Sequence, residues 1–503
     1  MATGAQITAG PRDWQIVQQE ADGYGTFALA GRVTRDAGEA GTVVARVVDE
    51  ATGAGVVPWQ RAAPDGDTWS LNLRAPAGGL YRIETGFSTT DEPRLEWARR
   101  GDLVHHVGVG DLYVIAGQSN AAGYGKDAVY DPPELGLHLL RNNLEWALAS
   151  HPLNDSTGSR HPVNSEGGNP GHSPYLAFAR RLKAALGYPI GLIQTSLGGS
   201  ALAQWRPEES GELYRNLLAV VAAAGGRVKG VLWYQGCADA AEGWGAAYGD
   251  RFAGFVTRLR ADLGQPGLPV LTVQLNRFAG PAGPGEDLHW SLVREAQRAA
   301  ARDLAGVAVV PALDLGLSDE VHNSAAGNLT LGLRLAEVAL ARVYGRGGYG
   351  VPDLAAARRT GPAEVTLEFS PVADRLFDFE VAPEESVFTV TDDAGPVPLA
   401  SETCVGATIV LGLARPLSGT AAVSALSGHH PRGLPPIDVT THCPILAFHR
   451  APVLEPTGRS AGSPIERSSP DLAPNTPAAW SRSLNRPAGT GAEGEGEGAG
   501  QGA

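Results

Sequence analysis

The chain has little cysteine, no basic cluster and no long apolar run. Its three cysteines, Cys237, Cys404 and Cys443, are too few and too scattered for a disulfide framework or a zinc site, although Cys404 and Cys443 could pair. The formal net charge is −14, whereas nucleic acids and anionic membranes are bound by positive surfaces. No segment approaches the roughly 20 apolar residues of a membrane-spanning helix. We therefore expect no nucleic-acid partner and no membrane partner.

Residues 1–8 lack the basic and apolar regions of a secretory signal peptide. Together with the low cysteine content, this favours a cytoplasmic protein in a reducing compartment. The expectation holds unless the natural chain begins further upstream with a signal peptide that is removed on secretion.

Length and composition predict a globular protein of several domains. A chain of 503 residues exceeds what one hydrophobic core usually supports. Hydrophobic residues make up 43% and charged residues 19%, which is typical of globular proteins. The 66 glycines and 36 prolines predict many turns and loops.

The pattern of elements changes twice along the chain. Residues 1–108 contain short alternating segments that predict a small β-sandwich: 26–33, 41–48 and 68–73. Residues 346–455 return to this pattern at 364–369, 387–391 and 408–411. The pattern leaves open whether this second β region folds alone or completes the first. Residues 456–503 are rich in Pro, Gly, Ser and Ala, which predicts a disordered tail.

Residues 109–345 alternate between apolar runs and helical patterns. The apolar runs are 112–116, 189–195, 230–234, 269–275 and 307–313. The helical segments are 175–186, 213–224, 248–263, 292–303 and 329–344. Continuous apolar strands that alternate with amphipathic helices predict an α/β domain, with a parallel sheet covered on both faces.

Residues with reactive side chains follow these strands, where active sites of α/β sheets collect. The first strand is followed by Gly117-Gln118-Ser119-Asn120, and the last by Asp319-Glu320-Val321-His322. An aspartate three residues before a histidine can accept from its Nδ1–H and leave Nε2 facing a nucleophile. Taken alone, each segment could equally be a polar loop, or a capping aspartate with a surface histidine.

Two further strand ends supply hydrogen-bond donors. The second strand leads into Gly198-Gly199-Ser200, where paired glycines let a backbone N–H approach a ligand. The third leads into Gln235-Gly236-Cys237, and the Gln235 amide can donate to a developing oxyanion. Each could alone be an ordinary turn or a helix-capping loop. Together, the four segments predict a nucleophile, oxyanion donors and a base with its orienting acid.

The sequence resembles the sialate O-acetylesterase family. The resemblance is carried by segments 111–120, 189–200, 232–236, 290–297 and 10–14, and by the Asp319–His322 spacing. This family shares the SGNH hydrolase fold with the acetylxylan esterases of carbohydrate esterase family six. The resemblance spans roughly residues 10–450, and its most specific motif surrounds Ser119.

The resemblance implies roles for individual residues. Ser119 matches the nucleophile, His322 the base and Asp319 its partner. The backbone N–H groups of Ser119 and Gly199 match oxyanion donors, and Gln235 is expected as a third donor.

One position departs from the family. Cys237 stands where its members usually have a glutamate that has been proposed to assist the histidine. Asp319 must then orient His322 alone, or Asp239 must help.

Several residues have competing interpretations. Cys237 could be the nucleophile, although free cysteine is often a small buried hydrophobe. His289 could be the base, with Asp287 or Glu286 as its acid. The substrate contacts are expected from Gln118, Asn120, Trp205 and Arg206, although Trp205 could be a core residue and Arg206 a surface residue.

The prediction is a serine carboxylester hydrolase that removes O-acetyl groups from acetylated sugars, above all sialic acid, without a metal or a cofactor. The alternative substrate is acetylxylan or another plant polysaccharide. An alternative of another class is a non-catalytic carbohydrate-binding protein on an esterase scaffold. The sequence makes no prediction about the oligomeric state.

Overall fold

The computed structural model describes residues 4–35, 39–90, 99–379 and 382–455. The segment predicted to be a disordered tail, 456–503, lies outside these residues. None of the helices in the described part of the chain is long and apolar enough to cross a membrane.

The N-terminal region consists of two sheets that share one core. One sheet has the strand order β1–β3–β7–β6, and the other contains β2, β4, β5, β8 and the first part of β9. The strand bounds are β1 (Gly4–Ala9), β2 (Ile16–Gln18), β3 (Tyr24–Thr34), β4 (Thr42–Asp49), β5 (Gly55–Arg61), β6 (Ala63–Asp65), β7 (Thr68–Pro76) and β8 (Gly78–Ser88). Phe27 and Trp69 from the first sheet are buried in the same cluster as Val47 and Ile83 from the second. Two facing sheets that alternate buried and exposed residues form a sandwich.

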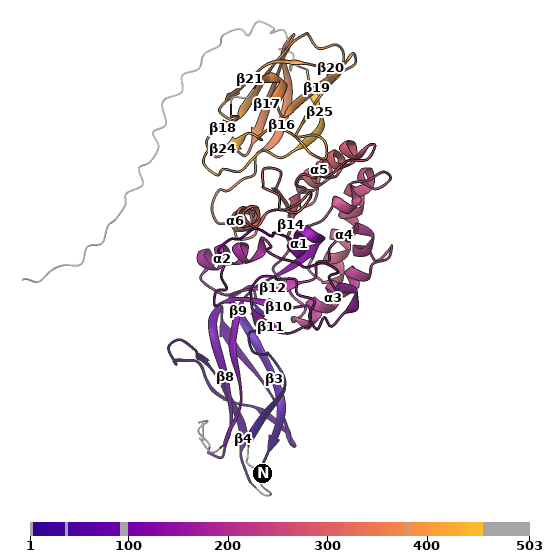
Figure 1. Ribbon diagram of the computed structural model, residues 1–503. Coiled ribbons are helices and arrows are strands. Elements are labelled where there is room, and N and C mark those ends of the chain that lie inside the picture. Colours follow the sequence, from indigo (N-terminus) through magenta and orange to yellow (C-terminus); the bar gives the residue numbers. More distant parts are fainter. Residues whose placement is uncertain (1–3, 36–38, 91–98, 380–381, 456–503) are drawn as a thin grey trace, which may run out of the picture. The chain divides into compact units, whose positions relative to one another are not determined.

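Strand β9 (Arg100–Gly117) runs from this sandwich into the next region (Figure 1). Its first part pairs antiparallel with β8 from Arg100 to Val109, and its second part pairs parallel with β12 from Asp111 onward. The predicted boundary between residues 108 and 109 therefore falls inside one continuous strand.

The central sheet is parallel apart from one edge strand. Its order is β11–β10–β12–β9–β13–β14–β15, and β11 pairs antiparallel with β10. The bounds are β10 (Leu137–Leu140), β11 (Trp146–Leu148), β12 (Ile190–Gln194), β13 (Gly230–Tyr234), β14 (Val270–Gln274) and β15 (Val307–Pro311). The central strands are buried at nearly every position, which explains their unbroken apolar runs.

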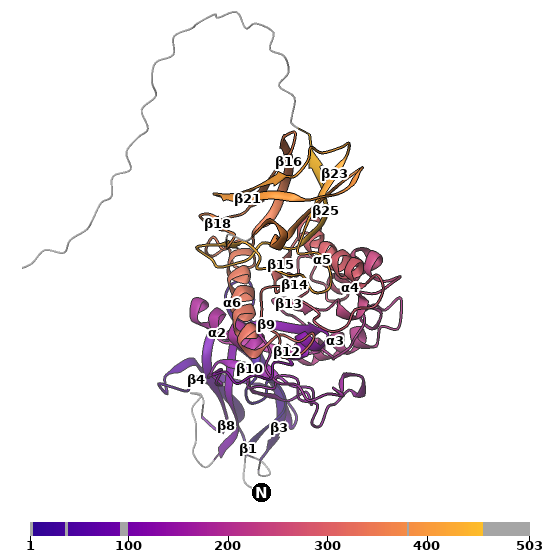
Figure 2. The same cartoon turned by 45° about the horizontal axis from the view of Figure 1, so that its top comes forward.

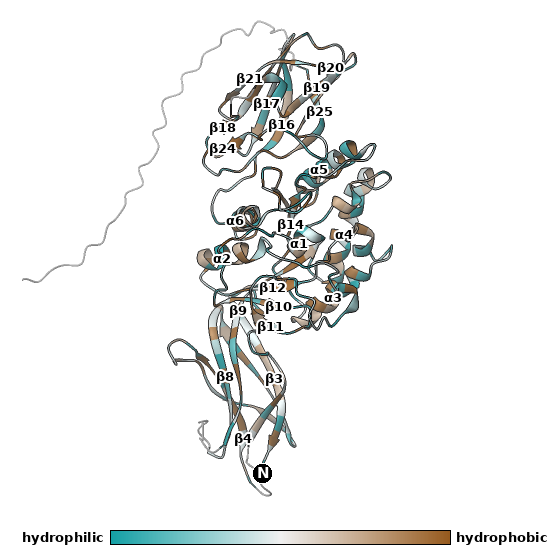
Figure 3. Ribbon diagram, viewed as in Figure 1, coloured by the Kyte–Doolittle hydropathy of each residue, from teal (hydrophilic) through white to brown (hydrophobic). Residues whose placement is uncertain are grey.

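Helices cover both faces of this sheet (Figures 1 and 2). Helices α2 and α6 pack together on one face, while α3, α4 and α5 lie on the other. Their bounds are α2 (Tyr175–Leu186), α3 (Glu212–Ala223), α4 (Tyr248–Asp262), α5 (Glu286–Asp303) and α6 (Ala325–Arg342). Hydrophobic and hydrophilic residues alternate along the helices (Figure 3), as expected for helices with one face on a core.

The helix ends follow local signals. Gly187 ends α2 in the left-handed conformation, with φ of 83°. Ser324 begins α6, because its Oγ accepts the N–H of Gly327 at 2.9 Å.

The C-terminal region is a separate β structure. Eight strands pair in the order β20–β19–β23–β25–β16–β17–β22–β21, and β18 pairs with β24. The bounds are β16 (Asp353–Gly361), β17 (Glu364–Ser370), β18 (Leu376–Phe377), β19 (Phe388–Asp392), β20 (Gly395–Val397), β21 (Leu399–Val405), β22 (Thr408–Leu413), β23 (Ala421–Ala425), β24 (Ile437–Asp438) and β25 (Phe448–Leu454). Within the described ranges, none of these strands pairs with an N-terminal strand. The predicted α/β class with β-rich flanking regions is confirmed.

Candidate active site

The predicted serine lies where β9 ends. Ser119 begins the one-turn helix α1 (Ser119–Ala122), two residues past Gly117. Gly117 has a φ of 127°, and a Cβ there would lie 2.2 Å from the carbonyl oxygen of Tyr234 at the end of β13. Only glycine fits this close approach. The turn leaves Ser119 at the carboxyl edge of the sheet, 9% exposed.

Asn120 ties the serine to the loop that carries His322. Its Nδ2 donates to the carbonyl oxygen of Val321 at 3.0 Å, and its Oδ1 accepts the N–H of Asn323 at 3.0 Å. These partners flank His322 in the sequence, so the two bonds hold His322 beside the serine turn. Asn120 was predicted as a substrate contact. In the structure it is buried, and both ends of its amide bind the protein.

Asp319 orients the histidine as the spacing predicts. Its Oδ2 accepts from His322 Nδ1 at 2.6 Å, and its Oδ1 accepts the backbone N–H groups of Val321 at 2.9 Å and His322 at 2.8 Å. Burial raises the pKa of Asp319, but these hydrogen bonds outweigh it and hold the pKa below its ordinary value. A carboxylate at Nδ1 keeps the proton of the neutral imidazole there and leaves Nε2 as the base.

Two neighbours of the site carry no sequence signal. The ring of Tyr124 stacks on His322, with ring centroids 4.7 Å apart. Its hydroxyl donates to Glu166 Oε1 at 2.9 Å, while Glu166 Oε2 accepts the N–H of Gly198 at 2.9 Å and Asn154 Nδ2 at 3.0 Å. Burial, followed by the Glu166 carboxylate, raises the pKa of Tyr124, so its hydroxyl remains a donor. Glu166 thereby links the histidine side of the site to the glycine loop.

The Gly198–Gly199 loop lies against the serine turn. The N–H of Leu197 donates to the carbonyl oxygen of Gly117 at 3.0 Å, and Ser200 Oγ donates to the same atom at 3.3 Å. Gly199 has a φ of 68° and no atom within 4 Å of the place a Cβ would take. Among the described residues, no acceptor binds the N–H of Gly199 or of Ser119. Both groups are therefore free to donate to a ligand.

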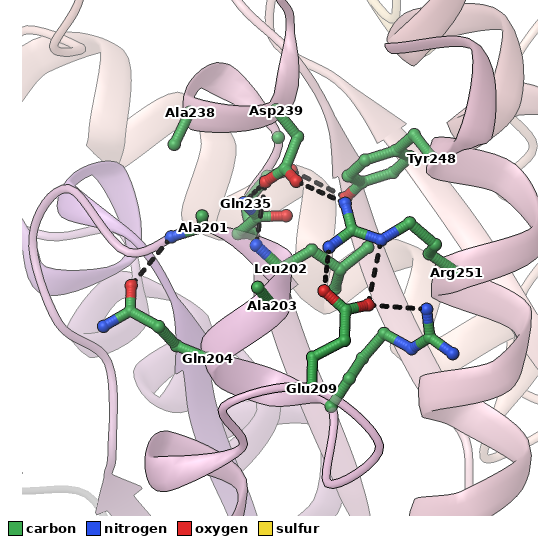
Figure 4. A network of polar contacts seen from close by, with 12 residues as sticks. Ala201, Leu202, Ala203, Gln204, Glu209, Gln235, Ala238, Asp239, Tyr248 and Arg251 are labelled. Atoms are coloured by element: carbon green, nitrogen blue, oxygen red, sulfur yellow. Dashed lines mark hydrogen bonds and ion pairs between the residues drawn. The ribbon is translucent and has the colours of Figure 1, made fainter. Parts of the chain in front are cut away.

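The Gln235 side chain is engaged elsewhere (Figure 4). It is fully buried, and its Nε2 donates to the carbonyl oxygen of Ser200 at 3.2 Å and to Asp239 Oδ2 at 2.6 Å. Both amide hydrogens are thus used inside the protein. Gln235 was predicted as a third oxyanion donor, and in this arrangement it would have to give up one of these bonds to act as one.

Asp239 is the centre of this network. Besides Gln235, it accepts the N–H of Leu202 at 2.8 Å and Nη1 of Arg251 at 2.8 Å (Figure 4). Arg251 in turn pairs with Glu209 at 2.7 Å. With its oxygens occupied in this way, Asp239 supports the loop after β12 rather than His322.

Cys237 lies within a turn held by Gln118. The Oε1 of Gln118 accepts the N–H groups of Gly236 at 3.0 Å and Ala238 at 3.2 Å. Its amide nitrogen has no partner among the residues described, so it is the free part of this predicted substrate contact. Burial raises the pKa of the half-buried Cys237 thiol to about 12. Activated cysteine nucleophiles have lowered pKa values, so this environment does not favour Cys237 as the nucleophile.

Within the described residues, the side chains of the remaining candidates form no hydrogen bond with Ser119. Trp205 is fully buried and packs edge-on against Trp233, so it is the core residue of the alternative interpretation. Arg206 pairs with Glu209 at 2.8 Å. The Nδ1 of His289 is buried without a partner, and Asp287 pairs with His429 rather than with His289.

One group of side chains in the described residues has metal-ligand chemistry. The ligand atoms of Asp131, His151 and His172 lie within 4.8 Å of one another. Asp131 Oδ2 accepts from both imidazoles, at 2.9 Å and 3.0 Å, and its other oxygen pairs with Arg180. The N–H of Ser173 points to Nδ1 of His151, which keeps the His151 proton on Nε2. Hydrogen bonds and one arginine thus account for this cluster.

A serine, a histidine and an aspartate thus lie at the carboxyl edge of one α/β sheet, which is where enzymes with such sheets carry their active sites. Residues 109–341 match the family described as carbohydrate esterase, sialic acid-specific acetylesterase. The chain is 32% identical over 252 residues to a probable carbohydrate esterase of Arabidopsis thaliana, covering 46% of this chain and 90% of that protein. The protein belongs to this family of carbohydrate esterases, which confirms the predicted resemblance.

A solved structure extends the likeness to the flanking regions. A carbohydrate acetylesterase from Xanthomonas citri matches 88% of this chain and 99% of its own, with a TM-score of 0.60 and 21% identity. At this identity the match shows a common fold. Because the match covers more of the chain than the central region alone, it includes the β-rich flanking regions.

Proposed function

We propose that the protein is a serine esterase of the SGNH type that removes O-acetyl groups from sugars, with acetylated sialic acid as its substrate. The observation that carries the proposal is the pair of hydrogen bonds from Asn120 to the residues on both sides of His322. These bonds support the proposal because they join the loop that carries His322 and Asp319 to the turn that carries Ser119.

The chemistry follows from these contacts. His322 Nε2 takes the proton of Ser119 Oγ as the oxygen attacks the acetyl carbonyl. The negative charge of the tetrahedral intermediate is stabilised by the free N–H groups of Ser119 and Gly199. The protonated histidine then gives its proton to the departing sugar hydroxyl.

The second half returns the enzyme to its starting state. A water molecule loses a proton to His322 and attacks the acetyl-serine ester. The new tetrahedral intermediate collapses, acetate leaves, and Ser119 regains its proton. No step uses a metal ion or a cofactor.

Two alternatives remain to be tested. The enzyme could prefer acetylated xylan or another plant polysaccharide, since esterases for different sugars share this chemistry. The chain could also be a carbohydrate-binding protein that has lost turnover, which the replacement of the family glutamate by Cys237 would favour. The complete Ser119, His322 and Asp319 set supports the enzyme.

Acetate release separates these possibilities. The purified protein should be given p-nitrophenyl acetate, O-acetylated N-acetylneuraminic acid and acetylated xylo-oligosaccharides. We expect kcat/KM to be at least tenfold higher for the acetylated sialic acid than for the xylo-oligosaccharides. A preference for xylo-oligosaccharides would refute the sialate assignment, and a folded protein without turnover of any of the three would refute the esterase.

A further inference from the structure

A tyrosine covers one face of the proposed base. The ring of Tyr124 stacks on the imidazole of His322, with the ring centroids 4.7 Å apart and the ring planes 21° from parallel. Asp319 holds the edge of the same imidazole at Nδ1. These two contacts, one on a face and one at an edge, fix the orientation of the ring that carries the proton in the proposed mechanism.

The backbone around Tyr124 is anchored on both sides. The N–H of Gly123 donates to the carbonyl oxygen of Ser119 at 2.8 Å. On the other side, the N–H of Gly125 donates to the carbonyl oxygen of His172 at 3.1 Å and its own carbonyl oxygen accepts the His172 N–H at 2.9 Å. Tyr124 therefore keeps a fixed place relative to the serine.

The hydroxyl of Tyr124 is bound by Glu166, a carboxylate whose donors are all neutral. The hydroxyl donates to Oε1 at 2.9 Å. Oε2 accepts the N–H of Gly198 at 2.9 Å and Nδ2 of Asn154 at 3.0 Å. Within the described residues, no lysine, arginine or histidine pairs with Glu166. An ion pair thus does not neutralise the negative charge of this carboxylate.

The same carboxylate supports the glycine loop after β12. A Cβ on Gly198 would lie 2.5 Å from Glu166 Oε1, so a side chain there would displace the carboxylate. The next peptide carries the free N–H of Gly199, one of the proposed oxyanion donors. Glu166 therefore contacts both the residue that supports the base and the peptide that precedes an oxyanion donor.

The charges around the stacked rings favour a protonated imidazole. A cation within about 6 Å of the centre of an aromatic face is attracted by the ring, and a protonated His322 would meet Tyr124 in this way. Asp319 places a negative charge at Nδ1, and Glu166 places another at the tyrosine hydroxyl. Lys126 acts in the opposite direction, with its Nζ 5.3 Å from the centre of the tyrosine ring. Of these charged groups, two carboxylates stand against one ammonium.

We propose that Tyr124 and Glu166 are positioning residues that act as a pair: Tyr124 stabilises the protonated form of His322, and Glu166 fixes both Tyr124 and the peptide before Gly199. The inference rests on the proposed esterase function and adds two residues to its site. His322 is protonated at the moment when the oxyanion forms, so the pair supports both charges of the tetrahedral intermediate. Interactions that strengthen in the transition state raise kcat.

Titration of His322 by NMR tests the pair without turnover. The ring signal of His322 is the one lost in His322→Asn, and its shift against pH gives the pKa in the full-length protein. We expect Tyr124→Leu to lower this pKa by about half a pH unit or more, because the protonated ring loses an aromatic face. Glu166→Gln should lower it as well, because a nearby negative charge favours the protonated form.

Kinetics on p-nitrophenyl acetate show whether the pair acts on the chemical step. We expect Tyr124→Leu and Glu166→Gln each to lower kcat by about tenfold or more, with KM changed by less than about threefold. Tyr124→Phe keeps the ring and loses only the bond to Glu166, so it should retain more activity than Tyr124→Leu. The effects of Tyr124→Phe and Glu166→Gln should be less than multiplicative in the double variant, because both remove the same hydrogen bond.

The matched controls lie at exposed positions outside this pair. Tyr130 is 88% exposed, and Glu145 is an exposed residue between β10 and β11. Tyr130→Leu and Glu145→Gln should keep the His322 pKa and the kcat of the wild type. Circular dichroism checks the fold of every variant.

Two results would overturn the proposal: an unchanged His322 pKa in folded Tyr124→Leu or Glu166→Gln, or a wild-type kcat in either variant. Failure of the esterase function looks different. It would appear as a wild-type protein that releases no acetate from any ester, and the NMR titration would still decide whether the pair acts on His322.

Discussion

At the scale of single residues, three aspartates of the catalytic region have different tasks because their partners differ. Asp319 binds His322, Asp239 binds Arg251 and Gln235, and Asp131 binds two histidines and an arginine. A carboxylate takes its role from the donors that surround it. Of the three, only Asp319 binds the histidine that Asn120 links to the serine turn, so the proposed mechanism depends on this one.

Replacement of the serine should abolish turnover without unfolding the protein. We expect Ser119→Ala to lower kcat by roughly 10³-fold or more, because members of a triad act as a unit. The control is Ser70→Ala, an exposed serine on β7 that should keep normal kinetics. Steady-state kinetics with circular dichroism make the comparison, and near-normal activity of a folded Ser119→Ala would refute the assignment.

Replacement of Asp319 should be nearly as severe. Asp319→Asn is expected to lower kcat by about 10⁴-fold, since an amide favours the wrong tautomer of His322. The depressed pKa of Asp319 also means that its charge stabilises the fold above its ordinary pKa of 3.8, and that this contribution is lost as the pH falls below it. The difference in Tm between wild type and Asp319→Asn should therefore shrink below about pH 4. A folded Asp319→Asn with ordinary kcat would exclude Asp319 as the orienting acid.

Cys237 should be dispensable for chemistry. Cys237→Ser and Cys237→Ala are expected to change kcat/KM by less than about tenfold, or roughly 1.4 kcal/mol of barrier. Because burial raises the pKa of the Cys237 thiol, little of it is ionised at pH 8, so iodoacetamide should react with it slowly at that pH and faster as the pH rises. Loss of activity in Cys237→Ala, or rapid inactivation at pH 8, would favour the cysteine as nucleophile.

At the scale of elements, the position of the glycine loop depends on the network behind it. The loop after β12 is held by Gly117 on one side and by Gln235 and Asp239 on the other. The free N–H of Gly199 stands between these anchors. The orientation of this proposed oxyanion donor is thus set by the residues behind the loop.

Removing the charge of Asp239, at the buried centre of the Arg251 network, should lower the free energy of unfolding more than removing the charge of Glu209 at its edge. The side chain of Asp239 is 2% exposed and that of Glu209 is 27% exposed, yet both bind Arg251. We expect Asp239→Asn to lower the free energy of unfolding by about 3 kcal/mol, because it weakens a buried ion pair. The matched Glu209→Gln should cost about 1 kcal/mol or less. Urea unfolding measures both.

If Asp239 also positions the loop, Asp239→Asn should lower kcat more than it raises KM. Similar kinetics for the Asp239 and Glu209 variants would show that Asp239 stabilises the fold without positioning the loop.

At the scale of the whole molecule, residues of the central region bind the backbone of the C-terminal region. The Nε2 of Gln274 donates to the carbonyl oxygen of Ala447 at 2.9 Å, and its Oε1 accepts the N–H of Ala447 at 2.8 Å. Arg298 of α5 pairs with Asp353 of β16. These contacts are buried or half-buried, so the two regions are expected to unfold together.

Arg294 is the strongest of these connections, because its buried guanidinium donates to the carbonyl oxygens of Asn276 in the central region and Gly428 in the C-terminal region. Arg294→Met would leave carbonyl oxygens of both regions without a donor, and we expect it to cost at least about 3 kcal/mol. Arg302→Met on the same helix removes a side chain that is 45% exposed, and should cost less than about 1 kcal/mol. Calorimetry should show one transition in the wild type and a lower Tm in Arg294→Met. Equal Tm values for the two variants would contradict this role.

The sequence alone determined which segments become strands and helices of the central domain. The five apolar runs form strands and the five periodic segments form most of the helices. A strand buried on both faces needs an unbroken apolar run, and a helix buried on one face needs apolar residues at helical spacing, so both can be recognised in the sequence. The first residues of the helices were harder to predict from the sequence. α5 begins at Glu286, six residues before its predicted start, since the polar residues of its first turn hide the apolar period. The four-residue strand β10 was too short to give a pattern.

The site divides in the same way. The sequence named Ser119, His322 and Asp319 as candidates, because each follows a strand and the Asp–His offset is local. Only the tertiary structure decided that Tyr124 and Glu166 lie beside them and that the Gln235 amide binds Asp239. The order of residues within a segment predicts the contacts made inside that segment. Contacts between distant segments depend on how the strands are ordered in the sheet and which loops meet at its edge, and no single segment encodes that.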